Sequence, residues 1–479
     1  GIVRRTGFER QSVRANIEHK LSKGIVLSVN SNYIRTNTDR GFTGNQNNSG
    51  ASIGYNISYV PNYFDLRPVN GVYPANPYFA ENPVAVTDNG INNALVNRFI
   101  QSFNLDINLF KNENSQLKFR VNGGLDYIQN TTKVYLPDDL QFQRGQANPG
   151  DVLVGKQESI NTNFQAAFVY DWKIKRVNFN TQVGLVRLDF KNNGLFNRGR
   201  GLAPGQVNIK QATVQEVESQ FESTQSDVGL FVQKQMNFED KIIGTVGMRM
   251  DKSNTNGDAN KFYGFPKASL AINLANFDFW KIDAISQLKP RVAYGQTAGP
   301  VPFGATFTSL GGVNIGGLLG ATVPTSIGNT NIVPERASEI EFGFDAGFLN
   351  NKILFEATYY VKTTLDNLQP LTLSPATGVV NTQSNEAEMR NKGFELGLSG
   401  TVVDKANFKW FSRLLWWKND ILITKLGIPS YTTGAFGTAL GTFLVQQGVS
   451  PTTIVGTPAI SPGVFTVWGN AQPDWTTSW

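Results

Sequence analysis

The fold is decided by the stretch LVNRFIQSFNLDINLF at residues 95–110. Apolar side chains recur at its odd positions from Leu95 to Leu109, whereas polar side chains recur at its even positions. A short polar turn follows at residues 111–115, and residues 117–127 then show the same alternation. Because successive side chains of a β-strand point to opposite faces, the stretch predicts an antiparallel hairpin with one apolar and one polar face.

The same hairpin pattern recurs along most of the chain. Short polar turns are expected near residues 21–24, 173–176, 237–240, 349–352 and 404–407. We expect about fourteen strands, many of them longer than the five or six residues that are usual in soluble proteins. A tilted strand needs about ten residues to cross a membrane, so the strand lengths favour a membrane β-barrel.

The connections at the other end of the hairpins are long. They are expected at residues 36–50, 61–93, 131–155 and 191–225. Short periplasmic turns at one end and long extracellular loops at the other are typical of outer-membrane barrels. The predicted fold is therefore an all-β chain that forms a transmembrane antiparallel β-barrel. A soluble propeller or β-solenoid lacks support, because the sequence has no fixed-period repeat.

Composition excludes several kinds of site and partner. The 479 residues include no Cys and one His, His19, which excludes a disulfide framework, a thiolate metal site and a multi-histidine site. The net charge is +6, but Lys and Arg are spread singly, so we expect no nucleic-acid partner. No run of 18 or more apolar residues predicts a membrane helix, which is also true of outer-membrane barrels.

Residues with catalytic or metal-binding potential are few. Asp138 and Asp139 are adjacent, but no nucleophile or second acid is placed near them, so we expect no catalytic residue and no enzyme. The loop at residues 251–260 offers oxygen ligands that suit Ca²⁺, including Asp251 and Asp258. Its spacing is not that of an EF-hand, and a plain turn explains it better. We therefore expect no metal ion and no cofactor.

Two loop regions carry aromatic side chains that are candidates for contact with a substrate or partner. Aromatic faces stack on sugars or pack on peptides, and neighbouring Asn and Asp side chains supply hydrogen bonds. A small core within the loop itself is the alternative interpretation of these rings. The candidate residues are Tyr63, Phe64, Tyr73, Tyr78, Phe79, Phe303 and Phe307.

Two long segments of the chain carry no charge. One lies between Arg291 and Glu335, and the other lies between Lys425 and Asp474. Long neutral segments with scattered apolar residues suit a protein–protein contact. Flexible surface loops are the alternative interpretation.

A series of short motifs runs through the second half of the chain. They are RMDKS at residues 249–253, FPKASLA at 265–271, LKPRVAYGQTAG at 288–299, PER at 334–336, EIEFGFD at 339–345, NKGFEL at 391–396 and GNAQPD at 469–474. In this order they resemble strand motifs of TonB-dependent outer-membrane transporters of the SusC/RagA type. Residues 1–3 and 14–17 resemble the segment just after the plug domain of that family. Lys252 stands where the family usually has Gly.

The resemblance implies the barrel part of a longer protein. Family members have a signal peptide, a TonB box and a plug domain inside a barrel of about 22 strands. Residues 1–479 are then expected to be a barrel fragment that is incomplete at both ends, without the signal peptide, the plug or the final strands. The implied partners are a SusD-like surface lipoprotein, TonB acting through the missing N-terminal region, and the lipid of a Gram-negative outer membrane.

Three hypotheses about function follow from the sequence. The first, implied by the resemblance, is TonB-dependent import of a large nutrient, an oligosaccharide or a peptide, with the SusD-like lipoprotein as a lid. The second is a structural role, in which the barrel is a subunit of a larger outer-membrane assembly or secretion complex. The third is a soluble all-β adhesin.

Overall fold

The computed structural model describes residues 3–44, 50–435 and 442–455, and most of these residues lie in β-strands. Within them, fourteen strands are ten residues or longer, which confirms the strand number predicted from the sequence. They are β1 (Gly7–Ser22), β2 (Ile25–Asp39), β3 (Ile91–Lys111), β4 (Ser115–Leu136), β5 (Asp151–Ile174), β6 (Val177–Leu202), β7 (Ala212–Phe238), β8 (Ile242–Ser253), β9 (Tyr263–Ile272), β10 (Ile285–Gly299), β14 (Glu335–Phe348), β15 (Ile353–Thr372), β16 (Asn381–Lys405) and β17 (Phe408–Leu426).

Shorter elements occupy the connections. The strands among them are β11 (Gly311–Ile315), β12 (Leu318–Thr322), β13 (Ser326–Ile327), β18 (Tyr431–Ala435), β19 (Thr442–Val445) and β20 (Ile454–Val455). The helices are α1 (Ile53–Ser58) and α2 (Pro83–Asn89), with 3₁₀ turns at Ile209–Gln211, Leu274–Asn276 and Pro375–Thr377. Within the described ranges, no helix is long and apolar enough to cross a membrane. The GNAQPD motif at residues 469–474 lies outside the described residues.

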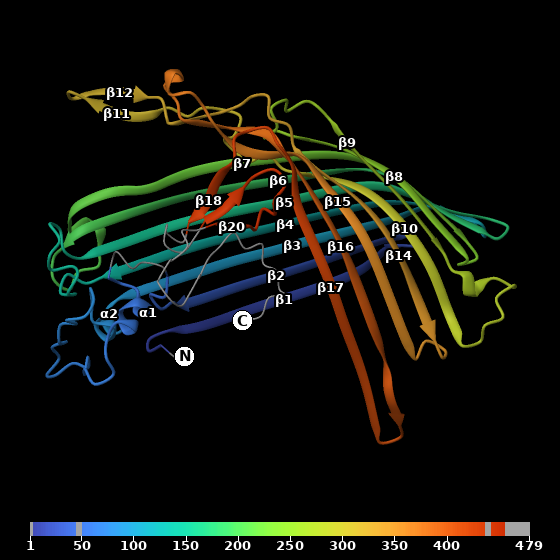
Figure 1. The fold of residues 1–479 in the computed structure, drawn as a ribbon, viewed down its shortest axis with the longest axis horizontal. Coiled ribbons are helices and arrows are strands. Elements are labelled where there is room, and N and C mark those ends of the chain that lie inside the picture. Colours follow the sequence, from blue (N-terminus) through green and yellow to red (C-terminus); the bar gives the residue numbers. More distant parts are fainter. Residues whose placement is uncertain (1–2, 45–49, 436–441, 456–479) are drawn as a thin grey trace, which may run out of the picture. The chain divides into compact units, whose positions relative to one another are not determined.

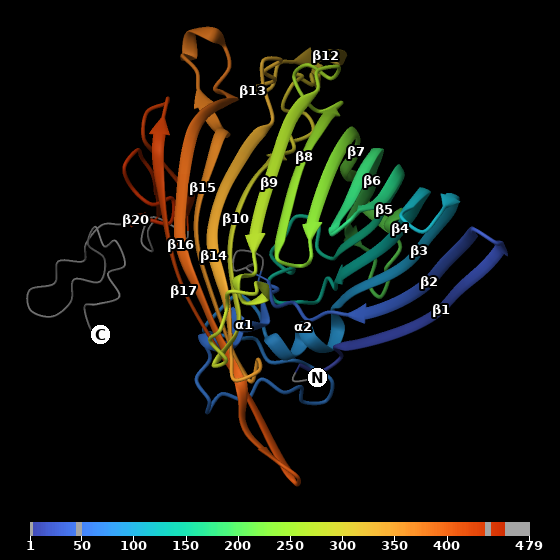
Figure 2. The ribbon, with the colours of Figure 1, turned by 90° about the vertical axis from the view of Figure 1, so that its right-hand side faces the viewer.

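The long strands follow one another in a single sheet, in which neighbours along the chain are neighbours in space (Figures 1 and 2). The order is β1 to β10, then β14, β15 and β16, with β17 paired to β16. In the pair β2 and β3, Leu27 lies opposite Leu105, and Asn30 lies opposite Ser102. Apolar residues therefore meet across the strands on one face and polar residues on the other, as the period of two requires.

The chain divides into two compact units. The first comprises Gly1–Ile107, Arg120–Gln165 and Arg187–Ser226, and the second comprises Asn108–Phe119, Ala166–Val186 and Asp227–Trp479. The first unit holds β1, β2, both α-helices and the long-loop ends of β3 to β7. The second unit holds the short-turn ends of these strands and the strands from β8 onward.

The two ends of the hairpins differ as the sequence predicted. Six connections contain two to four residues, at residues 23–24, 112–114, 175–176, 239–241, 349–352 and 406–407. The connections at the other ends are longer, and those between β2 and β3 and between β10 and β14 carry secondary structure of their own. Most of the loops that can recognise a ligand or partner therefore lie at one end of the strands.

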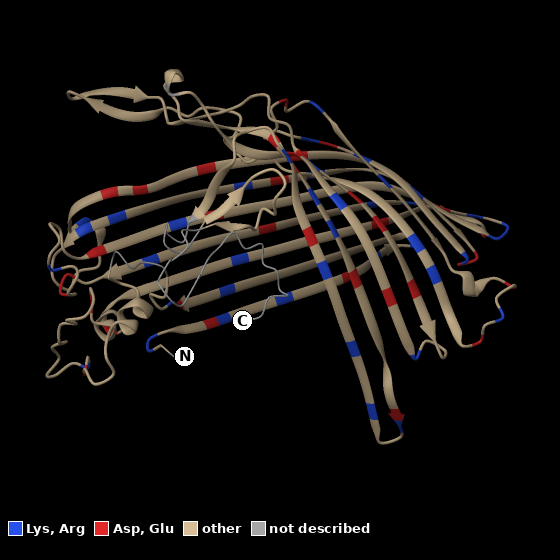
Figure 3. Ribbon diagram, in the orientation of Figure 1, with Lys and Arg blue, Asp and Glu red and all other residues tan. Residues whose placement is uncertain are grey.

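The apolar and polar faces of β3 illustrate how the strands are solvated. Phe99, Phe103 and Leu109 are exposed. On the polar face, Arg98 forms a cross-strand ion pair of 2.6 Å with Asp126 on β4. Figure 3 shows such charged residues scattered along the strands. A row of exposed apolar side chains on one face needs an apolar environment or a partner to cover it.

One predicted loop is wrong. Residues 191–225 were expected to form a long connection, but β6 continues to Leu202 and β7 begins at Ala212, so only residues 203–211 join the two strands. Apolar residues are few and irregularly spaced in these strand ends, so the regular alternation of apolar and polar residues that reveals a strand is missing there.

Cross-strand ion pairs hold this extension of the sheet together with a small buried apolar cluster of Tyr135, Val152, Leu202 and Ala212. Arg198 on β6 contacts Asp151 on β5 at 3.0 Å and Glu218 on β7 at 2.9 Å. Arg200 on β6 contacts Glu216 on β7 at 2.9 Å. These pairs join three neighbouring strands beyond the part of the sheet that the apolar pattern marks.

Candidate functional site

The loop between β2 and β3 and the loop between β4 and β5 pack together in the first unit. Seven buried apolar residues form the common core, and α1 and α2 contribute three of them. They are Phe42, Ala51, Ile53, Ala85, Val86, Leu136 and Leu140. We call residues 40–90 and 137–150, which meet around this core, the loop assembly.

A buried polar network fixes the shape of the loop assembly. Asn56, Asn76, Glu81 and Asn82 are at most 1% exposed. The Asn82 side chain accepts hydrogen bonds from the backbone of Val84 and Ala85 and so caps α2. Its amide nitrogen donates to the carbonyl oxygens of two other loop segments, at Leu66 and Pro74. A buried polar side chain that uses both its donors and its acceptor rigidifies the segments it joins.

Glu81 connects the two loops directly. One carboxylate oxygen accepts a hydrogen bond from the backbone N–H of Asn82 at 2.6 Å, and the other accepts from the backbone N–H of Phe142 at 3.1 Å. Burial raises the pKa of Glu81, although hydrogen bonds from backbone N–H groups favour the charged form. The cost of burying the carboxylate is therefore the larger effect.

Two further contacts connect the loops. The backbone N–H of Asn76 donates to the Gln141 side chain at 2.7 Å, and the Gln141 amide donates back to the Asn76 carbonyl at 2.9 Å. Gly50 has a φ of +73°, and a Cβ at this position would lie 2.8 Å from the ring of Phe142. Only glycine therefore fits here, because the conformation is left-handed and the ring is close.

An aromatic cluster lies on this rigid base. Tyr59 and Phe79 stack with ring centroids 4.7 Å apart, and Phe64 packs edge-on against Tyr78 at 5.7 Å. The hydroxyl groups of Tyr63 and Tyr78 are 3.3 Å apart, and the Tyr63 side chain is 78% exposed. We call these five residues the loop aromatic cluster. They present ring surface and hydroxyl groups to solvent, which suits contact with a sugar or a peptide.

The sequence predicted four members of the loop aromatic cluster and missed Tyr59. Tyr59 follows α1, so its position relative to Phe79 depends on how α1 packs, and no local pattern shows this. The nearby side chains of Asp65 and Arg67 form an exposed pair at 2.7 Å, and the hydrogen bonds from Arg67 lower the pKa of Asp65 to about 2.

The other predicted contact residues take different places. Tyr73 packs against the core of the loop assembly, and its hydroxyl donates to Asp88 at 3.2 Å. Phe303 and Phe307 belong to the second unit, where they pack edge-on at 5.4 Å and are each about half exposed. Tyr73 is therefore a structural residue of the loop assembly, whereas Phe303 and Phe307 form a second aromatic surface.

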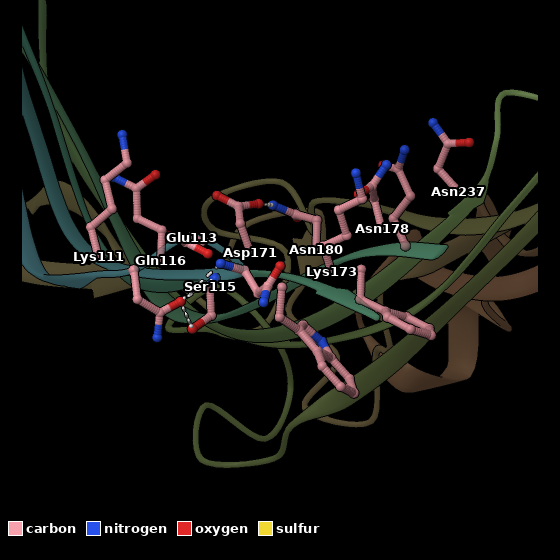
Figure 4. Close-up of a pocket in the computed structure, with 14 residues that line it drawn as sticks. Lys111, Glu113, Ser115, Gln116, Asp171, Lys173, Asn178, Asn180 and Asn237 are labelled. Atoms are coloured by element: carbon pink, nitrogen blue, oxygen red, sulfur yellow. Dashed lines mark hydrogen bonds between the residues drawn. The ribbon is translucent and has the colours of Figure 1, made fainter. Parts of the chain in front are cut away.

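A hollow of about 410 Å³ lies among the short turns of the second unit (Figure 4). Its lining is rich in amide side chains, and Figure 4 shows Asn180 directed at Asp171, to which it donates at 2.6 Å. Asn112 accepts hydrogen bonds from the backbone N–H groups of Asn114 and Ser115, which close the turn between β3 and β4. The Asn112 contacts therefore stabilise the turn between β3 and β4.

The preference for a plain turn over a Ca²⁺ site at residues 251–260 stays a prediction. Asp251 forms an ion pair with Arg249 at 2.8 Å, and Asp258 accepts a hydrogen bond from the backbone of Asn260. Within the described ranges, no group of three His, Asp or Glu side chains lies close enough together to hold a metal ion.

Comparison with known proteins identifies the family. The profile of the family described as "TonB dependent receptor-like, beta-barrel" matches residues 9–479. The chain belongs to this family of TonB-dependent receptors. This confirms the resemblance seen in the motifs, and it confirms the all-β barrel fold class. The family consists of receptors rather than enzymes, in agreement with the expectation from the sequence.

Individual relatives are distant but cover nearly the whole chain. TonB-dependent receptor P3 of Formosa agariphila is 22% identical over 467 residues, which are 93% of this chain and 45% of the relative. TonB-dependent receptor SusC of Bacteroides thetaiotaomicron is 23% identical over 380 residues, which are 74% of this chain and 36% of SusC. The chain thus spans less than half the length of the relatives that it matches.

The fold is also that of a solved transporter. The structure of the RagAB peptide transporter matches with a TM-score of 0.77 at 17% sequence identity, over 94% of this chain and 50% of the transporter chain. At this identity the match establishes the fold alone.

Proposed function

We propose that the chain forms part of the barrel of a TonB-dependent importer that takes a large nutrient, an oligosaccharide or a peptide, across a Gram-negative outer membrane. The observation that carries the proposal is the rigid loop assembly with its exposed aromatic cluster, at the long-loop end of a sheet whose strands belong to a receptor barrel family. Receptors capture ligands with loops that a rigid scaffold positions.

The strands have the properties that a membrane position requires. Each of the fourteen long strands among the described residues has at least the roughly ten residues that a tilted membrane-spanning strand needs. Next to the short turn at residues 175–176, Trp172 and Phe179 stack at 4.6 Å, and the Lys234 amine lies 5.2 Å from the Phe179 ring centroid. Aromatic rings with a neighbouring Lys suit the membrane interface, because the amine reaches the head groups.

The hairpin of β11 and β12 is the best candidate for contact with a SusD-like lipoprotein lid. It lies in the uncharged segment between Arg291 and Glu335, and Figure 3 shows no charged residue on it. Leu318 and Leu319 are 75% and 93% exposed. Exposed leucines at the tip of a neutral hairpin favour burial against another protein. TonB would act through the plug and N-terminal region of the whole protein.

A structural role in a larger outer-membrane complex is the second candidate, because the same hairpin also suits a permanent partner. The two functions differ in what the cell loses when the gene is deleted. Loss of a transporter removes growth on one nutrient, whereas loss of a structural subunit removes the complex.

The test is growth of the source bacterium, with and without the gene, on single oligosaccharides or peptides as carbon source. We expect the deletion to abolish growth on one class of large nutrient while growth on its monomers continues. Complementation with the whole gene should restore growth, and complementation with a Tyr63→Ala, Tyr78→Ala double variant should restore it only in part. Unchanged growth on every substrate, together with loss of a multi-protein outer-membrane complex, would contradict import and support the structural role.

A further inference from the structure

A cavity of about 890 Å³ lies in the first unit, next to the loop assembly. It is enclosed by the segment after β2, by the loop between β4 and β5, and by the long-loop ends of β4, β5 and β6. Three arginines line it, Arg40, Arg198 and Arg200, with a single carboxylate, that of Asp151. A volume of this size accommodates several sugar rings or a short peptide.

The arginines differ in how their charge is compensated. Arg198 is paired with Asp151 and Glu218, and Arg200 is paired with Glu216. The backbone N–H of Arg40 donates to the Asn92 carbonyl, but its guanidinium has neither an ion pair nor a hydrogen bond within the described part of the chain. An unpaired guanidinium beside a cavity attracts a carboxylate or another oxyanion, which it can bind through two parallel hydrogen bonds.

Neutral polar groups surround this charge. The side-chain oxygen of Asn92 is buried and has no hydrogen-bond partner. Gln146 and Asn148 also line the cavity, as do the rings of Phe42 and Phe142. Amide side chains that line a cavity accept hydrogen bonds from ligand hydroxyls and donate to them. Rings beside them can pack on the apolar face of a sugar.

We propose that this cavity binds an acidic oligosaccharide, with a carboxylate of the ligand on Arg40 and its hydroxyls on the amides of Gln146 and Asn148. A neutral sugar leaves Arg40 unpaired, and a cationic ligand offers Arg40 no oxyanion. An acidic peptide supplies the carboxylate but few hydroxyls. The inference rests on the proposed import function and specifies the class of nutrient.

The test is calorimetric titration of the purified full-length protein in detergent with three probes, tetragalacturonic acid, neutral maltotetraose and tetraglutamate. Tetragalacturonic acid should bind at least about tenfold more tightly than either other probe, and added NaCl should weaken its binding. Arg40→Gln should weaken the binding of tetragalacturonic acid about tenfold, because one charge-assisted contact is lost. Arg413→Gln on β17 removes the same charge outside the cavity lining and should leave the affinity unchanged.

Three results would overturn the inference, and two of them concern the choice of ligand. One is equal affinity for the acidic and neutral sugars, and the other is tighter binding of tetraglutamate. Unchanged affinity in the Arg40→Gln variant, with the same melting temperature as the wild type, would also overturn it, because the variant is then folded. The titration contains no TonB and measures no uptake. Failure of the binding prediction is therefore distinct from failure of import, which shows as normal growth of the deletion strain.

Discussion

The carboxylate of Glu81 accepts a hydrogen bond from the backbone N–H of Phe142 at 3.1 Å, and this bond joins the loop after β2 to the loop after β4. The other carboxylate oxygen accepts from the backbone N–H of Asn82 at 2.6 Å. Because Glu81 is buried, both N–H groups depend on it for a partner. Glu81 therefore contributes to the rigidity of the loop assembly, together with the Asn76–Gln141 hydrogen bonds and the apolar core.

The first prediction concerns Glu81→Ala. The variant leaves buried N–H groups without an acceptor, so we expect the loop assembly to lose about 2–4 kcal/mol of local stability. Hydrogen–deuterium exchange of the full-length protein should show faster exchange at residues 137–150 and unchanged exchange in the strands of the second unit. Glu113→Ala, in an exposed short turn, is the control. Unchanged exchange at residues 137–150 would show that Glu81 does not hold the loops together.

The second prediction is a pH dependence of the same loops. Burial raises the pKa of Glu81 in the folded loop, so the folded loop binds a proton more readily than the unfolded loop. The stabilisation that Glu81 gives the folded loop is fully present below the ordinary carboxyl pKa. It is lost as the pH rises through the raised pKa of the folded loop. Exchange at residues 137–150, corrected for the intrinsic rate, should therefore be slower at about pH 4 than at about pH 8. Glu81→Gln should remove most of this difference, and the opposite pH trend would disprove the assignment.

The third prediction separates recognition from folding in the loop assembly. Tyr63→Ala removes an exposed ring, so it should weaken nutrient binding and leave the melting temperature unchanged. Leu140→Ala creates a cavity at a side chain that is 1% exposed, and it should destabilise the loop assembly by about 2–5 kcal/mol. Binding by calorimetry and stability by thermal melting distinguish the two variants. Equal loss of stability in both would place Tyr63 in the loop core.

The fourth prediction concerns the extension of β5, β6 and β7. Arg198→Ala removes contacts to two neighbouring strands and should destabilise these strand ends by about 1–3 kcal/mol. Arg187→Ala is the control, because Arg187 pairs with Asp189 on its own strand. Exchange at residues 196–202 should increase in the first variant and not in the second. An equal increase in both would mean that cross-strand pairing does not hold the extension.

The fifth prediction tests the lid contact. Leu319→Asp places a charge on the neutral hairpin of β11 and β12, and it should abolish co-purification of a surface lipoprotein with the full-length protein. Leu319→Met keeps the side chain apolar and should retain the lipoprotein. Retention of the lipoprotein by the Leu319→Asp variant would place the lid contact elsewhere.

Much of the fold follows from local patterns in the sequence. Alternation in residues 95–110 predicted β3 and its apolar face, and polar turns predicted six of the short connections, because a strand period of two and a turn are both local properties. The ends of β6 and β7 escaped prediction, since ion pairs between neighbouring strands stabilise them and no local alternation marks such contacts.

The candidate site was less accessible to sequence reasoning. The aromatic residues of the loop after β2 are visible by composition. Tertiary packing, however, places Tyr73 against the core and brings Tyr59, for which no role was expected, onto Phe79. The tie between Glu81 and Phe142 spans 61 positions in the chain, and nothing in the sequence around either residue indicates the other. The packing of one loop on the other is therefore visible in the structure and not in the sequence.

The central claim is active import, and the most direct measurement is accumulation of a labelled nutrient by intact cells. The labelled nutrient is the one on which the deletion strain fails to grow. Accumulation is compared between cells with and without a functional TonB. We predict that accumulation requires both the gene and TonB, whereas binding at the cell surface requires only the gene. Accumulation that continues without TonB, or without the gene, would contradict the account.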